Sequence, residues 1–533
     1  MSVWLVAPDD SVTTAMAAMA GRLGGCTVSH AVTEPPAGVD VAVYRPHLRD
    51  GRPDLEEAAA FFRAAAGVLR LVLLSSAAVH APSHHNLGYV LESYRSQKSN
   101  PIADAWRELE ERAAVQLPGV ETIVLRPAHL AARDAGGLFA RLLSGRSAAV
   151  PPGFDPALQF LAPEDLAEAV ALAVEKGTGR PGIYHVAPRG AVSVRGALRL
   201  AGVRRVPLRW TAGGGWSDYL RHNATVSGRK IETELGFAPR KTSAEALLAA
   251  VGREGAAATP EFDDFGLDLG YIAAYERTLF RLLHDLYWRI EYQGLENVPR
   301  QGRAVLTGVH RGFMPWDGVM ALVGVHRATG RIPRFLIHPC LVKQPFLANY
   351  MTKLGGIVAC QENADWVLGQ DELLGMFPEG IHGAFTPYRQ AYKLGKFGRD
   401  EYVKMALRNR APIVPFVTVG SAEIYPIWGR LDWKWVKRAT EWLYLPLAPN
   451  FPFPGLPLPS KWHTRVLEPI HVEHQYGPEA AEDPAIVRAI SRDVKARMQE
   501  AIDDMLRRRR SIFLGSIFEG NAGVGETRGG EAL

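Results

Sequence analysis

The sequence has few cysteines and no long apolar run. Only three of its 533 residues are cysteine, and Cys26, Cys340 and Cys360 form no C-x-x-C pair. This spacing argues against a disulfide framework and against a zinc site, so we expect no metal. No run of about eighteen apolar residues is free of charge, because the best candidate contains Arg63 and Arg70. We therefore expect no membrane-spanning helix.

The composition lacks an extreme of either charge or polarity. Apolar residues make up 47% and charged residues 22%, as in ordinary globular proteins. The net charge of +5 is mild and fits an anionic membrane, an acidic substrate or no charged partner. The first residues, MSVWLVAPDD, lack the basic start of a signal peptide, so we expect none.

The first 250 residues alternate short apolar runs with amphipathic stretches. The apolar runs VWLVAP, VDVAVYRP, VLRLVLLSS, VETIVLRP and GIYHVAP predict buried strands, and the stretches between them predict helices. This alternation indicates a parallel sheet with helices on both faces. We expect a Rossmann-like, doubly wound α/β domain at 1–250, a linker at 251–265, a second α/β domain at 266–515 and a disordered tail at 516–533.

Four phrases of the first half resemble one enzyme family. They are LSSAAVHAP, TIVLRPAHL, FLAPEDLAEAVALAVE and GRKIETELGFAPR. Their order is similar to that in the extended short-chain dehydrogenase/reductase family, the NAD-dependent epimerase/dehydratase type. In that family the first phrase ends a strand with the catalytic serine, here Ser76. The resemblance implies a Rossmann fold and, in the family, a nicotinamide dinucleotide.

The turn after the first strand departs from that family. A dinucleotide needs a glycine-rich turn there, because the backbone must approach the pyrophosphate closely. This chain has Asp9 and Asp10 at the turn, and carboxylates repel phosphates. We therefore expect no required cofactor, with NAD(P) disfavoured, and a domain that is non-catalytic and either structural or regulatory.

Tyr94 and Lys98 have the Tyr-x-x-x-Lys spacing of that family's catalytic pair. A helix would place the two side chains on one face. However, Asn100 and Pro101 follow at once, and the better helix begins at about Pro101. A polar loop is the favoured interpretation, which leaves Tyr94 and Lys98 as weak candidates for cofactor binding.

Four phrases occur in a fixed order in the second half. They are TGVHRGFMPWDG with His310 and Asp317, LGGIVACQENADWVL at 354–368, GMFPEGIHGAF with Glu379, and APIVPFVTVGSAEIYP with Gly420. The ordered set resembles the glycerolipid acyltransferase family, which contains the acylglycerol-phosphate and lysophospholipid acyltransferases. The resemblance implies a C-terminal α/β acyltransferase domain that functions in phospholipid biosynthesis.

The first phrase carries the chemistry. An alcohol is a poor nucleophile at neutral pH, and a histidine can accept its proton during attack on a thioester. A carboxylate then fixes the imidazole tautomer, as in a serine-hydrolase triad without its serine. We predict His310 as the general base and Asp317 as its partner, although six residues separate them where the family commonly has four. Pro315 indicates a turn into a helix. A buried core histidine is the competing interpretation of His310.

The second and third phrases are expected to build the acceptor site. Acyltransferases that use a phosphate acceptor usually carry an arginine in each phrase, and here both are missing. The acceptor is therefore either bound by other cations or carries no phosphate, as in monoacylglycerol. Acyl-CoA or acyl carrier protein is the expected donor. The predicted acceptor-binding residues are Phe377, Pro378, Glu379, Gly380, Gln361, Arg389 and Lys393.

The segment from 428 to 462 is rich in tryptophan and basic residues. Tryptophan prefers the bilayer interface, and lysine and arginine favour anionic headgroups. We predict an interfacial loop, with core packing as the alternative, and a cytoplasmic protein bound peripherally to the inner face of the membrane. No nucleic-acid partner is expected. The tryptophans of this segment are Trp428, Trp433, Trp435, Trp442 and Trp462.

Three functions are compatible with the whole sequence. The favoured one is a peripheral acyltransferase that acylates a glycerolipid hydroxyl. The second is a bifunctional protein whose N-terminal domain is also an NAD(P)-dependent oxidoreductase or epimerase, which Asp9 and Asp10 disfavour. The third is a non-enzymatic lipid-binding scaffold, which the combination of His310, Asp317 and Glu379 disfavours.

Overall fold

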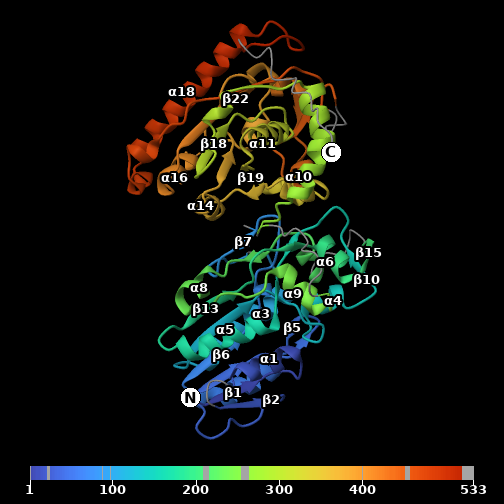
Figure 1. Cartoon of the computed structure of the whole chain (residues 1–533), viewed down its shortest axis with the longest axis vertical. Helices are drawn as coiled ribbons and strands as arrows, with labels where there is room; N and C mark the ends of the chain where they lie inside the picture. Colours follow the sequence, from blue (N-terminus) through green and yellow to red (C-terminus); the bar gives the residue numbers. More distant parts are fainter. Residues whose placement is uncertain are drawn as a thin grey trace, which may run out of the picture. The chain divides into compact units, whose positions relative to one another are not determined.

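The chain folds into two compact units (Figure 1). The computed structural model describes residues 2–20, 25–86, 88–96, 98–207, 215–253, 263, 265–398, 400–450 and 457–518. The N-terminal unit consists of Met1–Asp268 together with Leu341–Lys353, and the C-terminal unit of Leu269–Cys340 and Leu354–Leu533. Most of the expected linker at 251–265 lies outside the described residues.

A six-stranded parallel sheet forms the centre of the N-terminal unit, in the order β13-β8-β6-β3-β1-β2. The predicted apolar runs are five of these strands, and the predicted parallel sheet is confirmed. The sixth, β2, was not predicted. The bounds are β1 Val3–Val6, β2 Cys26–Ser29, β3 Val41–Tyr44, β6 Arg70–Leu74, β8 Glu121–Pro127 and β13 Gly182–Val186.

Helices cover both faces of this sheet. Because neighbouring strand residues point to opposite faces, Val3 and Leu5 belong to one apolar core and Trp4 and Val6 to the other. The first core includes helices α1 and α5, and the second includes α2 and α3. The helices are α1 Ser11–Ala20, α2 Leu55–Ala64, α3 Pro101–Gln116 and α5 Pro163–Lys176. The unit is therefore a doubly wound, Rossmann-like α/β domain.

Short elements complete the N-terminal unit. The strands among them form small two-stranded pairs. They are β4 Leu48–Arg49, β5 Arg52–Pro53, β7 Tyr89–Val90, β9 His129–Leu130, α4 Gly137–Leu143, β10 Ser147–Val150, β11 Ala157–Leu158, β12 Phe160–Leu161, β14 Val192–Ser193, α6 Val194–Ala201, β15 Arg204–Pro207, α7 Trp216–Tyr219, β16 Thr225–Val226, α8 Arg229–Leu235 and α9 Ser243–Ala250.

The segment Leu341–Lys353 packs within the N-terminal unit although its sequence neighbours belong to the other unit. Its Lys353 ammonium lies 2.9 Å from Asp155 and 3.5 Å from Asp268. The Phe346 amide donates to the Gly153 carbonyl. The two units are therefore not two consecutive stretches of sequence, which differs from the contiguous division that the sequence suggested.

A seven-stranded sheet forms the centre of the C-terminal unit, in the order β17-β25-β22-β18-β21-β19-β20. Only the β22–β25 pair is antiparallel among the described strand pairs of this sheet. The strands β18 and β22 are completely buried. The bounds are β17 Glu291–Gln293, β18 Ala304–Gly308, β19 Arg334–Ile337, β20 Ile357–Val358, β21 Leu373–Met376, β22 Ile413–Val419 and β25 His463–Val466.

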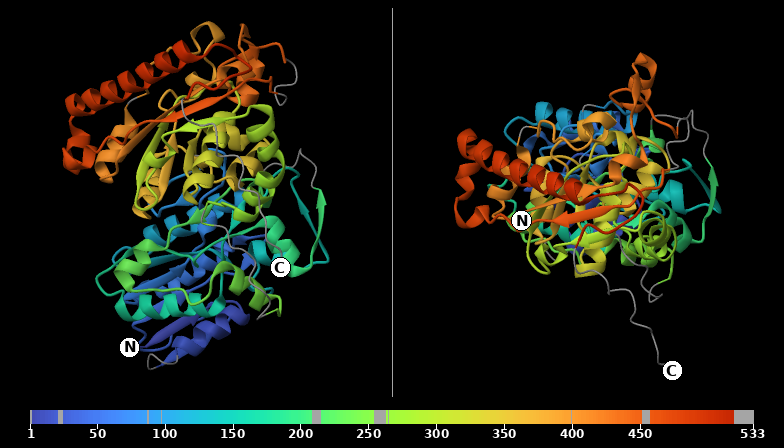
Figure 2. Two further views of the ribbon diagram at one scale, coloured as in Figure 1. Left: turned by 45° about the horizontal axis from the view of Figure 1, so that its top comes forward. Right: turned by 90° about the horizontal axis from the view of Figure 1, so that it is seen from above.

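Helices pack around this second sheet, and the long helix α18 lies against β22 (Figure 2). Helix α10 continues into two π-helical stretches, Glu276–Phe280 and Leu282–Tyr287. The remaining elements of this unit are α10 Leu269–Tyr275, α11 Trp316–Thr329, α14 Gln361–Gly369, α15 Ile381–Ala384, α16 Glu401–Arg408, β23 Gly429–Leu431, α17 Lys434–Thr440, β24 Leu445–Leu447 and α18 Pro484–Arg508. Helix α12 Pro339–Lys343 spans the boundary after Cys340, and helix α13 Leu347–Lys353 belongs to the N-terminal unit.

The described part of the chain extends to Phe518. The side chains of Ile517 and Phe518 are buried, and the Ser516 hydroxyl donates to Glu291. Residues 516–518 of the expected disordered tail are therefore ordered. None of the helices in the described part of the chain combines the length and the apolar character that crossing a bilayer requires.

Candidate active site of the C-terminal unit

Three neighbouring strands of the C-terminal sheet end at one edge. Strands β22, β18 and β21 are parallel and adjacent, so their carboxyl ends lie side by side. His310 follows β18, Phe377 follows β21 and Gly420 follows β22. The carboxyl edge is the usual location of ligand sites in open α/β sheets. The first, third and fourth phrases of the sequence therefore meet here.

His310 and Asp317 form a hydrogen-bonded pair. The His310 Nδ1 lies 2.8 Å from Asp317 Oδ2 and 2.9 Å from Oδ1. Pro315 stands directly before helix α11, and Asp317 is in the first turn of this helix. The predicted turn into a helix is confirmed, and it returns the carboxylate to the imidazole. The six intervening residues thus leave the two side chains in contact.

The surroundings of Asp317 keep its carboxylate a hydrogen-bond acceptor. Its side chain is fully buried and accepts hydrogen bonds from the amides of Arg311 at 2.7 Å and Gly318 at 2.8 Å, in addition to His310. With the carboxylate as acceptor, the His310 proton is on Nδ1 and Nε2 carries a lone pair. The Nε2 atom makes no hydrogen bond within the described part of the chain. It is therefore available to take a proton.

Aromatic rings fix the plane of the imidazole. The His310 and Phe377 rings stack at 4.8 Å between centroids, and the Phe335 ring stacks on the Phe377 ring at 5.5 Å. Gly375 leaves room for this stack, since a Cβ atom there would lie 2.7 Å from Phe335. The Phe377 ring therefore supports the histidine, which is a different role from the predicted contact with the acceptor.

Arg311 and Glu379 form a buried ion pair beneath His310. Arg311 Nη1 lies 2.7 Å from Glu379 Oε2, and both side chains are almost completely buried. The guanidinium also donates to the carbonyls of His310, Ala391 and Lys393. The pair connects the first phrase, the third phrase and the loop near 391–395. This arrangement holds the backbone on which His310 stands.

A second buried network anchors the same loop. Tyr392 donates to Glu423 at 2.6 Å, and Arg509 donates to the same carboxylate at 2.5 Å. Burial and the Glu423 charge raise the pKa of Tyr392 well above its ordinary value, so its hydroxyl stays protonated. On helix α18, Gln499 bonds to the Tyr392 carbonyl and to the Leu394 amide. The C-terminal helix therefore braces the loop that Arg311 holds.

The predicted acceptor-binding residues have different positions. Both Glu379 carboxylate oxygens are used internally, because Gly395 donates to Oε1 in addition to Arg311. Of the two roles considered for Glu379, its contacts match the one that braces the His310 loop. Gln361 begins helix α14 and donates to Asp365 in that helix. The Arg389 and Lys393 side chains are exposed, Pro378 is buried, and Gly380 has a positive φ of 55°.

Sequence reasoning missed Arg311 and the Tyr392–Glu423–Arg509 network. A signal for Arg311 was present in the sequence. A buried arginine directly after His310 needs a carboxylate as its ion-pair partner, and Glu379 is the acidic residue of the third phrase. The members of the second network are scattered over more than one hundred positions, with 117 between Tyr392 and Arg509. Nothing local in the sequence relates them.

The N-terminal candidates Tyr94 and Lys98 make separate contacts. The Tyr94 hydroxyl lies 3.4 Å from Asn86, and the Lys98 ammonium lies 3.0 Å from Asp218. Both residues are in an irregular segment before helix α3, which begins at Pro101 as predicted. Ser76 caps the short helix that follows β6. The polar-loop interpretation of Tyr94 and Lys98 matches these contacts.

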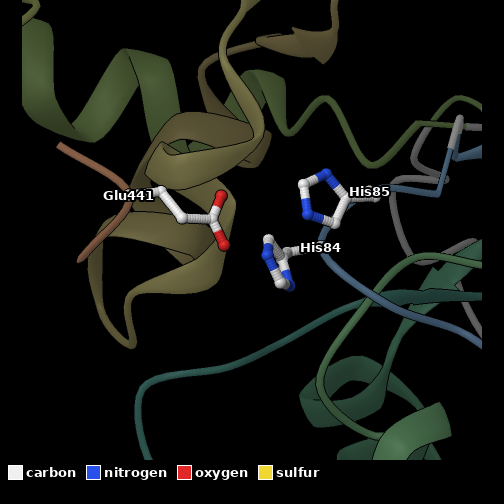
Figure 3. Close-up of side chains that lie close together, drawn as sticks. All are labelled: His84, His85 and Glu441. Carbon is white, nitrogen blue, oxygen red and sulfur yellow. The ribbon is translucent and has the colours of Figure 1, made fainter. Parts of the chain in front are cut away.

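Some side chains outside the His310 set could ligate a metal. In the C-terminal unit, the ligand atoms of His471, Glu473 and His474 lie within 4.8 Å of one another, on the surface. Glu473 already accepts from His471 at 2.7 Å. In the N-terminal unit the His84 and His85 rings lie 4.1 Å apart (Figure 3). Glu441, the third side chain of that figure, belongs to the C-terminal unit. Among the described residues, no hydrogen bond or ion pair joins any of these groups to His310.

The tryptophan-rich segment divides into two sets. Trp428, Trp433 and Trp435 are exposed at 73%, 46% and 68%. In contrast, Trp462 is completely buried and stacks on Trp288 at 4.5 Å. Its predicted interfacial position is wrong, because Trp462 directly precedes β25 and is in the core. Trp442 is half-buried and packs edge-on against Phe313.

Comparison with known proteins identifies the second half. The sequence model of the family named Acyltransferase matches residues 289–419. An uncharacterized protein of Mycobacterium tuberculosis is 36% identical over 259 residues, which cover 48% of this chain and 72% of the relative. An uncharacterized protein of Mycobacterium leprae is 34% identical over 306 residues, which cover 56% of this chain and 82% of the relative.

Solved structures are similar to the other half. MoeE5 in complex with UDP-glucuronic acid and NAD is 16% identical with a TM-score of 0.39, and the likeness covers 48% of this chain and 98% of that one. The human epimerase family protein SDR39U1 with NADPH is 16% identical with a TM-score of 0.39, over 47% and 98%. The UDP-glucose 4-epimerase of Thermotoga maritima is 13% identical with a TM-score of 0.38, over 48% and 98%.

Proposed function

Because the chain belongs to one family with these mycobacterial proteins and carries an acyltransferase domain at residues 289–419, we propose that it acylates a glycerolipid. The donor is acyl-CoA or acyl carrier protein, and the acceptor is a hydroxyl of a lysophospholipid or an acylglycerol phosphate. The domain itself supports acyl transfer in general. The donor, the acceptor and the role of His310 are the parts that we add.

The proposed reaction needs one proton acceptor. The acceptor hydroxyl binds at His310 Nε2, and its oxygen attacks the thioester carbonyl carbon while its proton moves to Nε2. Asp317 stabilises the imidazolium that forms. When the tetrahedral intermediate collapses, the carbon–sulfur bond breaks and the thiolate takes the proton from Nε2. The products are an ester and a free thiol, and His310 is neutral again.

The observation that carries this proposal is the orientation of the imidazole. Asp317 holds Nδ1, Phe377 holds the ring plane, and Nε2 makes no hydrogen bond to any described residue. A buried core histidine would have both nitrogen atoms paired or its ring sealed from solvent. The His310 side chain is instead 14% exposed. This arrangement is suited to general base catalysis.

The experiment that tests the proposal is an acceptor panel. Purified full-length protein is incubated with radiolabelled palmitoyl-CoA and with a lysophospholipid, an acylglycerol phosphate, glycerol 3-phosphate or monoacylglycerol. We expect a labelled ester with at least one acceptor that already carries an acyl chain. Exposed Arg389 and Lys393 would favour a phosphate acceptor. Consumption of palmitoyl-CoA that does not depend on any added alcohol would contradict the assignment.

We also propose that the protein binds the inner, cytoplasmic face of the membrane through residues 428–438. Trp428, Trp433 and Trp435 are exposed, and Lys434 and Arg438 lie among them on or beside helix α17. Exposed tryptophans with adjacent cations suit the interface of an anionic bilayer. A lipid acceptor would then reach the site without leaving its membrane.

Replacing Trp433 and Trp435 by serine is expected to weaken binding to phosphatidylglycerol vesicles about tenfold or more. The reason is that burial of one large apolar side chain is worth about 1.5–3 kcal/mol. Cosedimentation of the full chain with the vesicles measures this effect. Val115→Ser in the N-terminal unit is the matched control, because Val115 is exposed to a similar degree. Equal losses in both variants would contradict the surface assigned here.

A further inference from the structure

The N-terminal unit has a cleft at the carboxyl ends of its strands. The cleft has a volume of about 580 Å³ with its open mouth, and it is lined by residues that follow β3, β6 and β8. In this sheet β1 lies between β2 and β3. The strands that follow β1 in the sequence are therefore added first on one side of it and then on the other, and the strand order reverses at this point. Ligands of open α/β sheets bind in the crevice at such a reversal. The cleft lies beside this reversal, at the carboxyl ends of β3, β6 and β8, and none of its lining residues follows β1 directly.

The place of a dinucleotide phosphate is filled by the protein itself. Asp10 caps helix α1 by accepting from the Thr13 amide, and the same carboxylate pairs with Arg45 at 2.7 Å. Asp134 accepts from both the amide and the hydroxyl of Ser11, at the first position of this helix. A pyrophosphate would meet two carboxylates at the helix N-terminus, where a Rossmann cofactor needs free amides. The residues present do not fit NAD(P).

Arg45 cannot compensate for these carboxylates. Its side chain is buried and satisfied by Asp10, Thr13 and the Ala135 carbonyl. Removing it from Asp10 to bind a ligand phosphate would leave a buried carboxylate unpaired, which is costly. The cleft therefore presents no cation that is free to bind an anion among the described residues that line it.

The walls of the cleft are mainly apolar, and the polar side chains among them are Arg45, Ser75, Ser76 and His129. Arg45 is paired with Asp10, the Ser75 hydroxyl donates to Glu110, and the Ser76 hydroxyl accepts from the Ala78 amide. Leu74, Leu138, Trp106 and Trp216 are among the lining residues. His129 lines this cleft and also an adjoining hollow of about 370 Å³ with its open mouth, where Ala78 and Ala157 are among the other lining residues.

His129 supplies an uncharged polar group. Burial lowers the pKa of His129 to about 4, so the imidazole is neutral at pH 7. It makes no hydrogen bond to any residue that the structure describes. A neutral ring in an apolar cleft without other partners is suited to one hydrogen bond with an uncharged ligand.

From these observations we propose that the N-terminal unit binds an uncharged, mainly apolar small molecule that carries one hydroxyl or carbonyl group. The body of the ligand lies against the leucine and tryptophan side chains, and its polar group pairs with His129. This site is separate from the His310 site and does not depend on the function proposed for it. The Rossmann fold thereby keeps a ligand position at the carboxyl ends of its strands but changes the ligand class from a charged dinucleotide to a neutral molecule.

The test uses hydrogen–deuterium exchange of the full chain with 1-decanol, decanoate or NADH as probes. We expect 1-decanol to slow exchange in residues 75–79 and 128–130, and decanoate and NADH to leave these residues unchanged. Protection by NADH in the same residues would overturn the proposal. Unchanged exchange there with saturating 1-decanol would also overturn it.

Two variants locate the site. Ala78→Phe fills the space shared by both cavities and is expected to abolish the decanol protection. His129→Leu removes the polar partner without filling the cleft, and is expected to weaken decanol binding about five- to tenfold. Circular dichroism and urea unfolding of each variant serve as the check that it is folded. Full decanol binding by a folded His129→Leu protein would contradict the role assigned to His129.

Discussion

Replacing His310 by alanine is expected to lower the rate of acyl transfer by a factor of about 10²–10⁴. The variant loses the only group of the pair that can accept the alcohol proton, while Asp317 keeps its hydrogen bonds from the Arg311 and Gly318 amides. The backbone of the site should therefore remain in place. Steady-state kinetics with radiolabelled acyl-CoA and the best acceptor of the panel measure the loss.

His326→Ala is the matched control for this prediction. His326 is on helix α11, the helix that also carries Asp317, and it bonds to Glu276 rather than to the His310 set. The control should retain the rate of the unmodified protein within about twofold. Asp317→Asn should also be strongly impaired, because the amide no longer fixes the reactive tautomer. A small and equal effect of His310→Ala and His326→Ala would end the case for a general base at position 310.

Breaking the Arg311–Glu379 pair is expected to destabilise the C-terminal unit by about 3–5 kcal/mol. Either Arg311→Met or Glu379→Gln leaves the partner buried without its counter-charge or its hydrogen bonds. The double variant removes both charges and should recover part of this free energy. Urea unfolding of the four proteins, followed by tryptophan fluorescence, gives the coupling free energy of the pair.

The control for the ion pair is a similar pair on the surface. Arg408 and Glu482 are 2.6 Å apart and their side chains are 36% and 74% exposed, so breaking the pair should cost about 1 kcal/mol or less. The contrast between the two pairs isolates the contribution of burial, because the chemistry of the charged groups is the same. If Arg311→Met destabilises the protein no more than Arg408→Met does, the buried pair is not the support of the His310 loop.

The fold of the N-terminal half could be predicted because its central strands are buried on both faces. Such strands are continuous apolar runs, as in VWLV of β1 and VAVY of β3. Strand β2 was missed because it is at the edge of the sheet, where Cys26, Thr27, Val28 and Ser29 are only partly buried. An edge strand needs no apolar run, so its sequence carries no comparable signal.

The candidate site was predictable only where its chemistry is local. His310 and Asp317 are seven positions apart, and the demand of a histidine for a carboxylate relates them. Arg311 and Glu379 are 68 positions apart, and only the adjacency of β18 and β21 brings them together. Trp462 shows the opposite failure, since its aromatic and basic neighbours suggested an interface while its position directly before β25 is in the core. Composition alone does not distinguish these two environments.

The segment Leu341–Lys353 determines how the polypeptide can be divided into fragments. Because Asp155 and Gly153 hold a piece of chain that begins and ends among acyltransferase strands, no single cut of the polypeptide separates two self-sufficient halves. A fragment that starts after residue 268 would lose the partners of Lys353. The two units are therefore interlaced along the sequence rather than joined end to end.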